Sequence, residues 1–132
     1  MKKLVFKNGT EIAFIECYSA PEYVQGAERD VLDFRFDASQ VSLDDIDKLF
    51  TSDQCSHLTI RETVGEQTEE FIHENYGVRV ALSKQRFTVA TEDGAEDVEQ
   101  ISVKMAQYTV VELQMISLTE TVDVLVMESL LD

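Results

Sequence analysis

Basic side chains are scarce in this sequence. Its 11 Lys and Arg residues stand against 26 Asp and Glu residues, which gives a formal net charge of -15 at pH 7. Nucleic acids and anionic membranes carry the same sign of charge, and they are repelled within a Debye length of ~10 Å. We therefore expect neither nucleic acid nor a membrane as a direct partner, and we interpret the acids as a solvated surface that keeps the protein soluble.

Cysteine, proline and glycine are also rare. The two cysteines, Cys17 and Cys55, are too few for a disulfide framework and lack the spacing of metal ligands, so we expect reduced thiols in an intracellular protein. One proline and five glycines leave little material for long linkers, while hydrophobic residues make up 44% of the 132 residues. This composition predicts about one folded domain.

Long apolar runs are missing as well. The N-terminal run Leu4-Val5-Phe6 stops at Lys7. A secretory signal needs about 7–15 apolar residues and a membrane-spanning helix about 18–20. We expect a soluble protein that stays in the cytoplasm of the producing cell unless an assembly carries it out.

The sequence also lacks catalytic and cofactor motifs. It has no Gly-rich phosphate loop, no His-Glu-x-x-His and no Gly-x-Ser-x-Gly. Cys55 and His57 are the nearest approach to a nucleophile and a base; they share a face if both lie on a strand, but no orienting acid or oxyanion site is recognisable. Asp44-Asp45-Ile46-Asp47 lacks the Gly and the terminal Glu of a calcium loop. We predict that the protein is not an enzyme and has no catalytic residues, no cofactor and no metal site.

What the sequence does contain, over most of its length, is apolar alternation typical of β-strands. Asn8-Gly9, the favoured pair of a two-residue type I′ turn, predicts a hairpin near the N-terminus. We expect a polar connection over residues 19–30, a turn at 83–85 and an acidic loop over 92–96. The expected strands lie at residues 3–7, 10–16, 31–37, 57–61, 70–73, 78–82, 86–90 and 101–105.

A short helix is expected between the strands, over residues 43–50. Ser42 precedes it as an N-cap, and Asp45 stands at the third helical position of a capping box. These patterns predict an α+β fold with a mainly antiparallel β-sheet or partly open barrel of about six or seven strands, one short helix and a long C-terminal helix. We divide the chain into a β-rich domain over residues 1–106 and a C-terminal helix over 107–132 used for packing or oligomerisation.

The C-terminal helix is predicted from apolar residues at alternating spacings of three and four. Its Val and Thr content is also compatible with a strand, but ~24 residues is long for one. Two apolar stripes run along the helix, and a surface helix usually has one. The first stripe consists of Tyr108, Val111, Met115, Leu118, Val122 and Leu125. The second consists of Val110, Leu113, Ile116, Val124, Met127 and Leu131.

The presence of two stripes indicates that this helix is covered from both sides. We expect one stripe to pack on the sheet of its own subunit and the other to meet a second copy of the chain. The predicted oligomer interface is Tyr108, Val111, Met115, Leu118, Val122 and Leu125, in a dimer ahead of a trimer. From Met105 to Asp132 the chain carries five acids and no Lys or Arg, so ion-paired heptad flanks are not expected.

In this order, the segments resemble small structural proteins encoded among the tail and baseplate genes of tailed phages and prophages of Gram-positive bacteria. The resembling segments are residues 3–12, Ser42 to Phe50 with Leu58-Thr59-Ile60, Tyr76-Gly77-Val78, and Thr109 to Gln114. The resemblance implies a non-catalytic structural or assembly component that acts through protein–protein interaction. Its partners are then further copies and other virion or assembly proteins, and incorporation into a virion is expected. No site residues carry over from these proteins.

An alternative function stays open. A strongly acidic protein can imitate the phosphates of DNA and so inhibit a host DNA-binding protein, which requires acids in regular rows on one face. Here the acids form scattered clusters near residues 44–47, 66–70 and 92–99. This scatter favours the structural role over mimicry.

Overall fold

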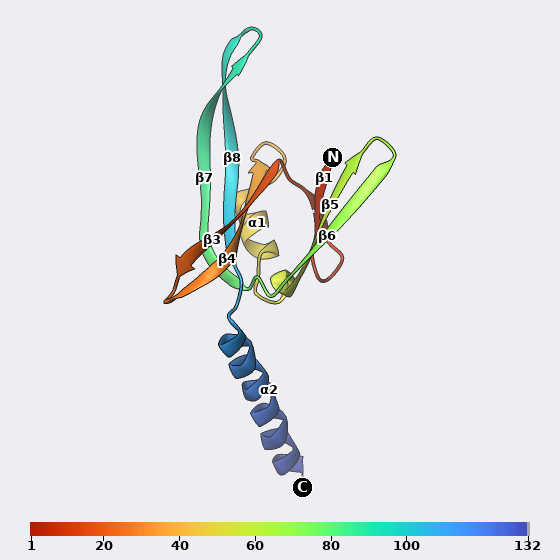
Figure 1. Ribbon diagram of the computed structural model, residues 1–132, viewed down its shortest axis with the longest axis vertical. Helices are drawn as coiled ribbons and strands as arrows, with labels where there is room; N and C mark the ends of the chain where they lie inside the picture. The colour runs from red at the N-terminus through yellow and green to blue at the C-terminus, as the bar shows by residue number, and fades with distance from the viewer. Residues whose placement is uncertain (132) are drawn as a thin grey trace.

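The computed structural model describes residues 1–131, so Asp132 of the predicted C-terminal helix lies outside the described part. These residues form two four-stranded antiparallel sheets with strand orders β2-β1-β5-β6 and β3-β4-β8-β7, together with two α-helices (Figure 1). The predicted α+β class with a mainly antiparallel sheet is confirmed, and the sheets do not close into a barrel.

In chain order the elements are β1 Lys2–Val5, β2 Glu11–Ala13, β3 Glu16–Val24, β4 Ala27–Asp37, α1 Leu43–Leu49, the 3-10 helix η1 Gln54–Ser56, β5 His57–Val64, β6 Gln67–Glu74, β7 Val78–Thr91, β8 Gly94–Ala106 and α2 Val110–Leu131.

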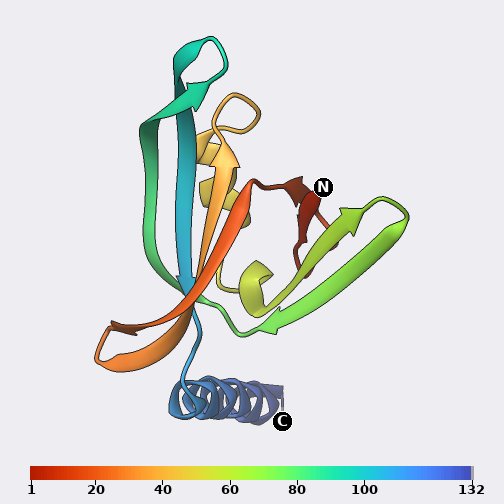
Figure 2. The same cartoon turned by 45° about the horizontal axis from the view of Figure 1, so that its top comes forward.

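The chain passes from one sheet to the other three times: between β2 and β3, between β4 and β5 by way of α1 and η1, and between β6 and β7. At the first, the Phe14 N–H donates to the Lys2 carbonyl (3.1 Å), and the next N–H, of Ile15, donates to the Arg35 carbonyl of the other sheet (2.8 Å). Such switching lets two sheets enclose one core at an angle (Figure 2). The residues 1–106 that form both sheets and α1 are called the β-domain below.

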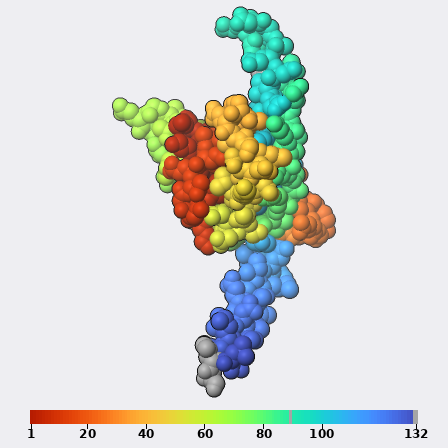
Figure 3. All heavy atoms as spheres, turned by 180° about the vertical axis from the view of Figure 1, so that it is seen from behind, coloured from red at the N-terminus to blue at the C-terminus, as the bar shows by residue number. Residues whose placement is uncertain are grey.

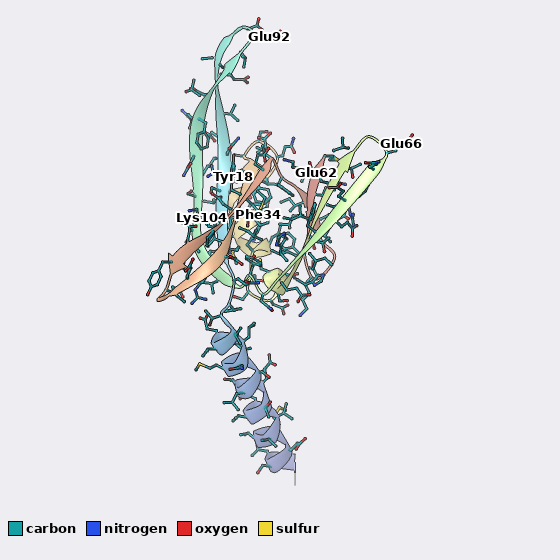
Figure 4. All side chains as sticks on the ribbon, in the orientation of Figure 1. Tyr18, Phe34, Glu62, Glu66, Glu92 and Lys104 are labelled. Carbon is teal, nitrogen blue, oxygen red and sulfur yellow. The ribbon has the colours of Figure 1, made fainter. Side chains whose placement is uncertain are left out.

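The core lies between the two sheets. The predicted inward face of β4 is confirmed, since Leu32, Phe34 and Phe36 are all buried. Phe34 points into this core (Figure 4), and its ring centroid is 5.6 Å from that of Phe14 and 5.7 Å from that of Phe50. Edge-to-face and tilted ring pairs of this kind add to the stabilisation from burial.

Helix α1 has the predicted capping box. The Asp45 N–H donates to the Ser42 hydroxyl oxygen (3.1 Å), and the Asp45 carboxylate accepts from the Ser42 N–H (3.5 Å). The helix buries Ile46, and Phe50 at its C-cap enters the aromatic core. Figure 3 shows α1 and the N-terminal strands packed together in the body of the molecule.

The N-terminal hairpin is confirmed, but its turn is not the predicted type I′. Gly9 has a φ of 89°, while Asn8 does not take a positive φ. The Phe6 N–H donates to Thr10 O (2.9 Å) and the Gly9 N–H to Phe6 O (2.9 Å), so three residues form the loop, with glycine in the bulge position. The Asn8 carboxamide accepts from the Thr10 N–H (2.9 Å), a local bond that suits the longer loop.

Two further predictions were wrong because strands extend past the core. Residues 19–30 are not a connection: β3 and β4 pair throughout, around a turn in which Gln25 and Gly26 have φ values of 47° and 82°. Pro21 is tolerated because β3 is an edge strand. Residues 83–85 are not a turn either, since β7 continues to Thr91 opposite Gly94 of β8. The acidic loop is therefore shorter than the expected 92–96.

These extended ribbons give the molecule its shape. The β3–β4, β5–β6 and β7–β8 hairpins project from the body as three arms, and α2 projects as a fourth (Figures 1 and 3). Side chains near the arm tips reach solvent on both faces of the ribbon and therefore lack the alternation that marks a half-buried strand.

Candidate interaction site on helix α2

Helix α2 begins with a capping box that joins it to the β-domain. The Glu112 N–H donates to the Thr109 hydroxyl oxygen (3.1 Å), and the Glu112 carboxylate accepts from the Thr109 N–H (2.9 Å). This reciprocal pair satisfies two backbone donors that a helix start would otherwise leave free. The helix therefore begins at Val110, three residues after the expected start.

A buried arginine holds this first turn in place. The Arg29 side chain, 3% exposed, forms an ion pair with Glu112 and donates to the carbonyls of Val24 (2.9 Å) and Gln107 (3.2 Å). The Arg29 guanidinium, followed by the Thr109 N–H, lowers the pKa of Glu112 to about 2. The carboxylate is thus charged at neutral pH and ties α2 to β4.

Tyr108 adds a packed contact on the same joint. Its ring lies against Val31, Val78 and Ala106, and its N–H donates to the Asn75 carbonyl (2.8 Å). Gly77 permits this approach, because a Cβ there would overlap the Tyr108 ring. Tyr108, predicted for the oligomer interface, therefore precedes the helix and packs half-buried on the β-domain.

Beyond its first turn α2 projects away from both sheets, and its side chains from Gln114 to Leu130 are exposed (Figures 1 and 2). The other predicted interface residues are exposed: Val111 in the first turn by 63%, and Met115, Leu118, Val122 and Leu125 on the free part by 63, 64, 49 and 58%. The expectation that one stripe packs on its own sheet was wrong. Periodicity shows which residues share a face, whereas the joint at Arg29 and Tyr108 decides where the helix points.

Apolar residues of α2, all exposed except the half-buried Leu113, form two faces about 170° apart on a helix of ~3.6 residues per turn. Face A consists of Val111, Met115, Leu118, Val122, Leu125 and Val126. Face B consists of Val110, Leu113, Ile116, Val124 and Met127. Between them, the Thr119 and Thr121 hydroxyls donate to the Met115 (2.9 Å) and Ser117 (3.0 Å) carbonyls, which satisfies these polar groups inside the helix.

The Cys55–His57 pair does not form the shared face considered above. Cys55 is buried in η1, and burial raises the pKa of its thiol to about 12, whereas His57 is exposed at the start of β5 with its Nδ1 3.7 Å from a Glu74 carboxylate oxygen. Within residues 1–131 no group of three or more His, Cys, Asp or Glu side chains is arranged to hold a metal ion.

A cavity of about 200 Å3 lies between the sheets near β3. Phe14, Leu32, Ile60 and Phe71 provide its apolar walls, and Cys17 contributes a thiol whose pKa burial raises to about 12. A thiol with so high a pKa is protonated at neutral pH and is therefore a poor nucleophile. Lys2, Glu16, Glu62 and His73 also line the cavity, so its wall is part apolar and part charged.

The helices of the described chain do not combine the length and apolarity that a bilayer crossing requires. The chain matches no protein-family profile, no curated protein and no solved structure. The geometry of α2 and of its joint therefore carries the functional argument.

Sequence reasoning found the apolar residues of α2 but missed the joint that fixes the helix. The Thr109-x-x-Glu112 pattern is readable as a capping box. Arg29 lies 83 residues before Glu112, inside a segment expected to be a polar connection, and no local signal links the two.

Proposed function

We propose that this protein is a non-catalytic structural or assembly component that acts through protein–protein interaction and self-associates through face A of α2. The observation that carries the proposal is a helix fixed at its base with its apolar side chains in solvent. Full burial of a Val, Leu or Met side chain contributes ~1.5–3 kcal/mol, so the six residues of face A offer a substantial gain on association.

The composition of α2 indicates that the helix is stabilised by packing of its apolar side chains against another surface. Valines, threonines and an isoleucine recur along the helix, and β-branched residues are only moderate helix formers. Packing of an apolar face supplies most of the stability of helices in proteins. Association through face A would therefore stabilise the helix itself.

Electrostatics permit two copies to meet through face A. Gln114, Thr119 and Thr121, which flank the middle of this face, are uncharged. Glu112 flanks its start, but Arg29 already neutralises that carboxylate. Two copies can thus approach along most of the face without like-charge repulsion.

We place this role among the tail-associated components of phages and prophages that the sequence resembles. The partners are then further copies of the chain and other virion or assembly proteins. The protein is made in the cytoplasm of the producing cell and leaves it as part of the particle.

Mimicry of DNA by an acidic inhibitor is the second candidate, and the arrangement of acids favours assembly over it. Glu66 and Glu92 lie near the tips of separate arms (Figure 4), and Asp44, Asp45 and Asp47 lie on α1. Acids spread over several projections do not make the single row of negative charge that a DNA groove-binding protein recognises.

The test compares the mass in solution of the wild-type chain with that of Leu118→Lys/Val122→Lys, measured by light scattering over a range of concentrations. We expect a multiple of 15.0 kDa for the wild type and 15.0 kDa for the variant, with unchanged β-strand circular dichroism. The wild-type mass should persist at high salt, because apolar contacts are not screened. A wild-type monomer at high concentration would overturn the proposal.

A further inference from the structure

The two faces of α2 differ in charge. Glu120 lies four residues after Ile116 and four before Val124, which places its carboxylate in the middle of face B. Asp123 lies at the border of the same face, beside Met127. Face A contains no charged side chain among its six residues.

A second copy of the chain has little to offer these carboxylates. All Lys and Arg side chains other than Lys3 and Lys48 already form ion pairs within residues 1–131. The described part of α2 carries acids and no base. Two helices packed through face B would bury Glu120 of each copy near other carboxylates, which is unfavourable without a cation.

We propose that face B docks a different protein, through an amphipathic helix that presents Lys or Arg beside its apolar stripe, opposite Glu120 and Asp123. Complementary charge selects this partner, and the aliphatic and methionine side chains of face B supply the apolar contact. The inference rests on the proposed self-association. Because the faces lie about 170° apart, copies joined through face A present face B outward.

Glu120 then has two roles. It attracts the basic partner, and it prevents further copies of the chain from stacking on face B. Specificity commonly depends on such a repulsive element beside an attractive one.

The test uses a synthetic amphipathic helical peptide with a leucine stripe flanked by lysines, and a matched peptide with glutamates in place of the lysines. Binding to the full chain is measured by fluorescence anisotropy at ~0.15 M salt. We expect the wild type to bind the lysine peptide about tenfold more tightly than the glutamate peptide, and Glu120→Lys to lose that preference.

Glu92→Lys is the matched control, because it changes the net charge equally but lies at the tip of the β7–β8 arm (Figure 4). We expect it to leave the dissociation constant nearly unchanged. If Glu92→Lys weakens binding as much as Glu120→Lys, the peptide senses only the overall charge, and the proposal is overturned.

Light scattering on the same variants separates this inference from the proposed function. Glu120→Lys should leave the oligomer mass unchanged, and Glu120→Leu should raise it by opening face B to further copies. A lower mass for Glu120→Lys would mean that a second copy already occupies face B, which overturns the inference but leaves self-association intact. A monomeric wild type that still binds the lysine peptide through Glu120 overturns the proposed function and supports face B as a docking surface.

Discussion

Strand β4 and helix α2 carry similar apolar side chains, but those of β4 are buried and those of α2 are exposed. Leu32, Phe34 and Phe36 of β4 are exposed by 1, 0 and 0%, whereas Leu118 and Val122 of α2 are exposed by 64 and 49%. The β-domain completes its core within one copy, while the apolar side chains of α2 beyond its first turn are exposed to solvent. Apolar periodicity identifies a face that needs cover, and the rest of the chain decides whether the cover is internal.

The joint between the two regions is made of specific contacts. Arg29, Tyr108 and Glu112 bring together an ion pair, a packed ring and a capping box. A flexible tether would allow α2 to fold back on the sheets, whereas these contacts hold it outward. Contacts at its base and exposure beyond its first turn thus occur together in α2.

The largest difference in stability between the β-domain and α2 is expected when one apolar side chain in each is shortened to alanine. Phe34→Ala removes a ring that packs against Phe14 and Phe50, and should lower the free energy of unfolding by about 3–5 kcal/mol. Leu118→Ala should change the free energy of unfolding of the dissociated chain by about 0.5 kcal/mol or less, because the side chain is exposed. Urea denaturation at low protein concentration measures both, and equal losses would contradict the comparison.

The next effect concerns the joint. Glu112→Gln removes the anion from a buried guanidinium, so we expect lower stability and a less firmly held α2. Hydrogen exchange of the amides in the first turn of α2 provides the measurement. Glu128→Gln, in the free part of the helix, is the matched control and should leave that turn as protected as in the wild type.

The same contact predicts a pH dependence. The pKa of Glu112 is lowered from 4.5 to about 2, so its contribution to stability is complete above pH 4.5 and is lost as the pH falls toward 2. The difference in unfolding free energy between the wild type and Glu112→Gln should therefore be constant at neutral pH and shrink in acid. A difference that does not vary with pH would argue against the ion pair.

A smaller effect is expected at Gly77. Gly77→Ala forces the Tyr108 ring away from its site, and overpacking of this kind typically costs about 1–3 kcal/mol. Tyr108→Ala removes the ring and should make the added methyl group nearly harmless, so a double-mutant cycle isolates the contact. Additive losses would show that the ring and the glycine are independent.

The smallest effect is expected at the cap of α1. Ser42→Ala removes the acceptor for the Asp45 N–H, and such losses typically cost ~1 kcal/mol. Ser42→Asp keeps an acceptor and should retain most of the stability. Thermal denaturation distinguishes the two variants. Equal melting temperatures would show that the Ser42 cap does not stabilise the protein.

Prediction from sequence succeeded where one face of an element is buried. The alternation of Leu32, Phe34 and Phe36 marked β4, and the Ser42 capping box marked α1. It failed at the arms, since strands that pair beyond the core expose both faces, and their polar residues resemble turns. Face A of α2 was readable from its spacing, but its direction depends on Arg29 and Gly77, which are distant in sequence.

The most direct test of the account is disulfide cross-linking of single cysteines placed on the two faces of α2. Leu118→Cys on face A and Val124→Cys on face B are oxidised side by side with the wild type, whose Cys55 is buried and Cys17 half-buried. A disulfide needs Cβ atoms about 4 Å apart. The account predicts rapid covalent dimers for Leu118→Cys and none for Val124→Cys; equal cross-linking of both faces, or none on face A, would contradict it.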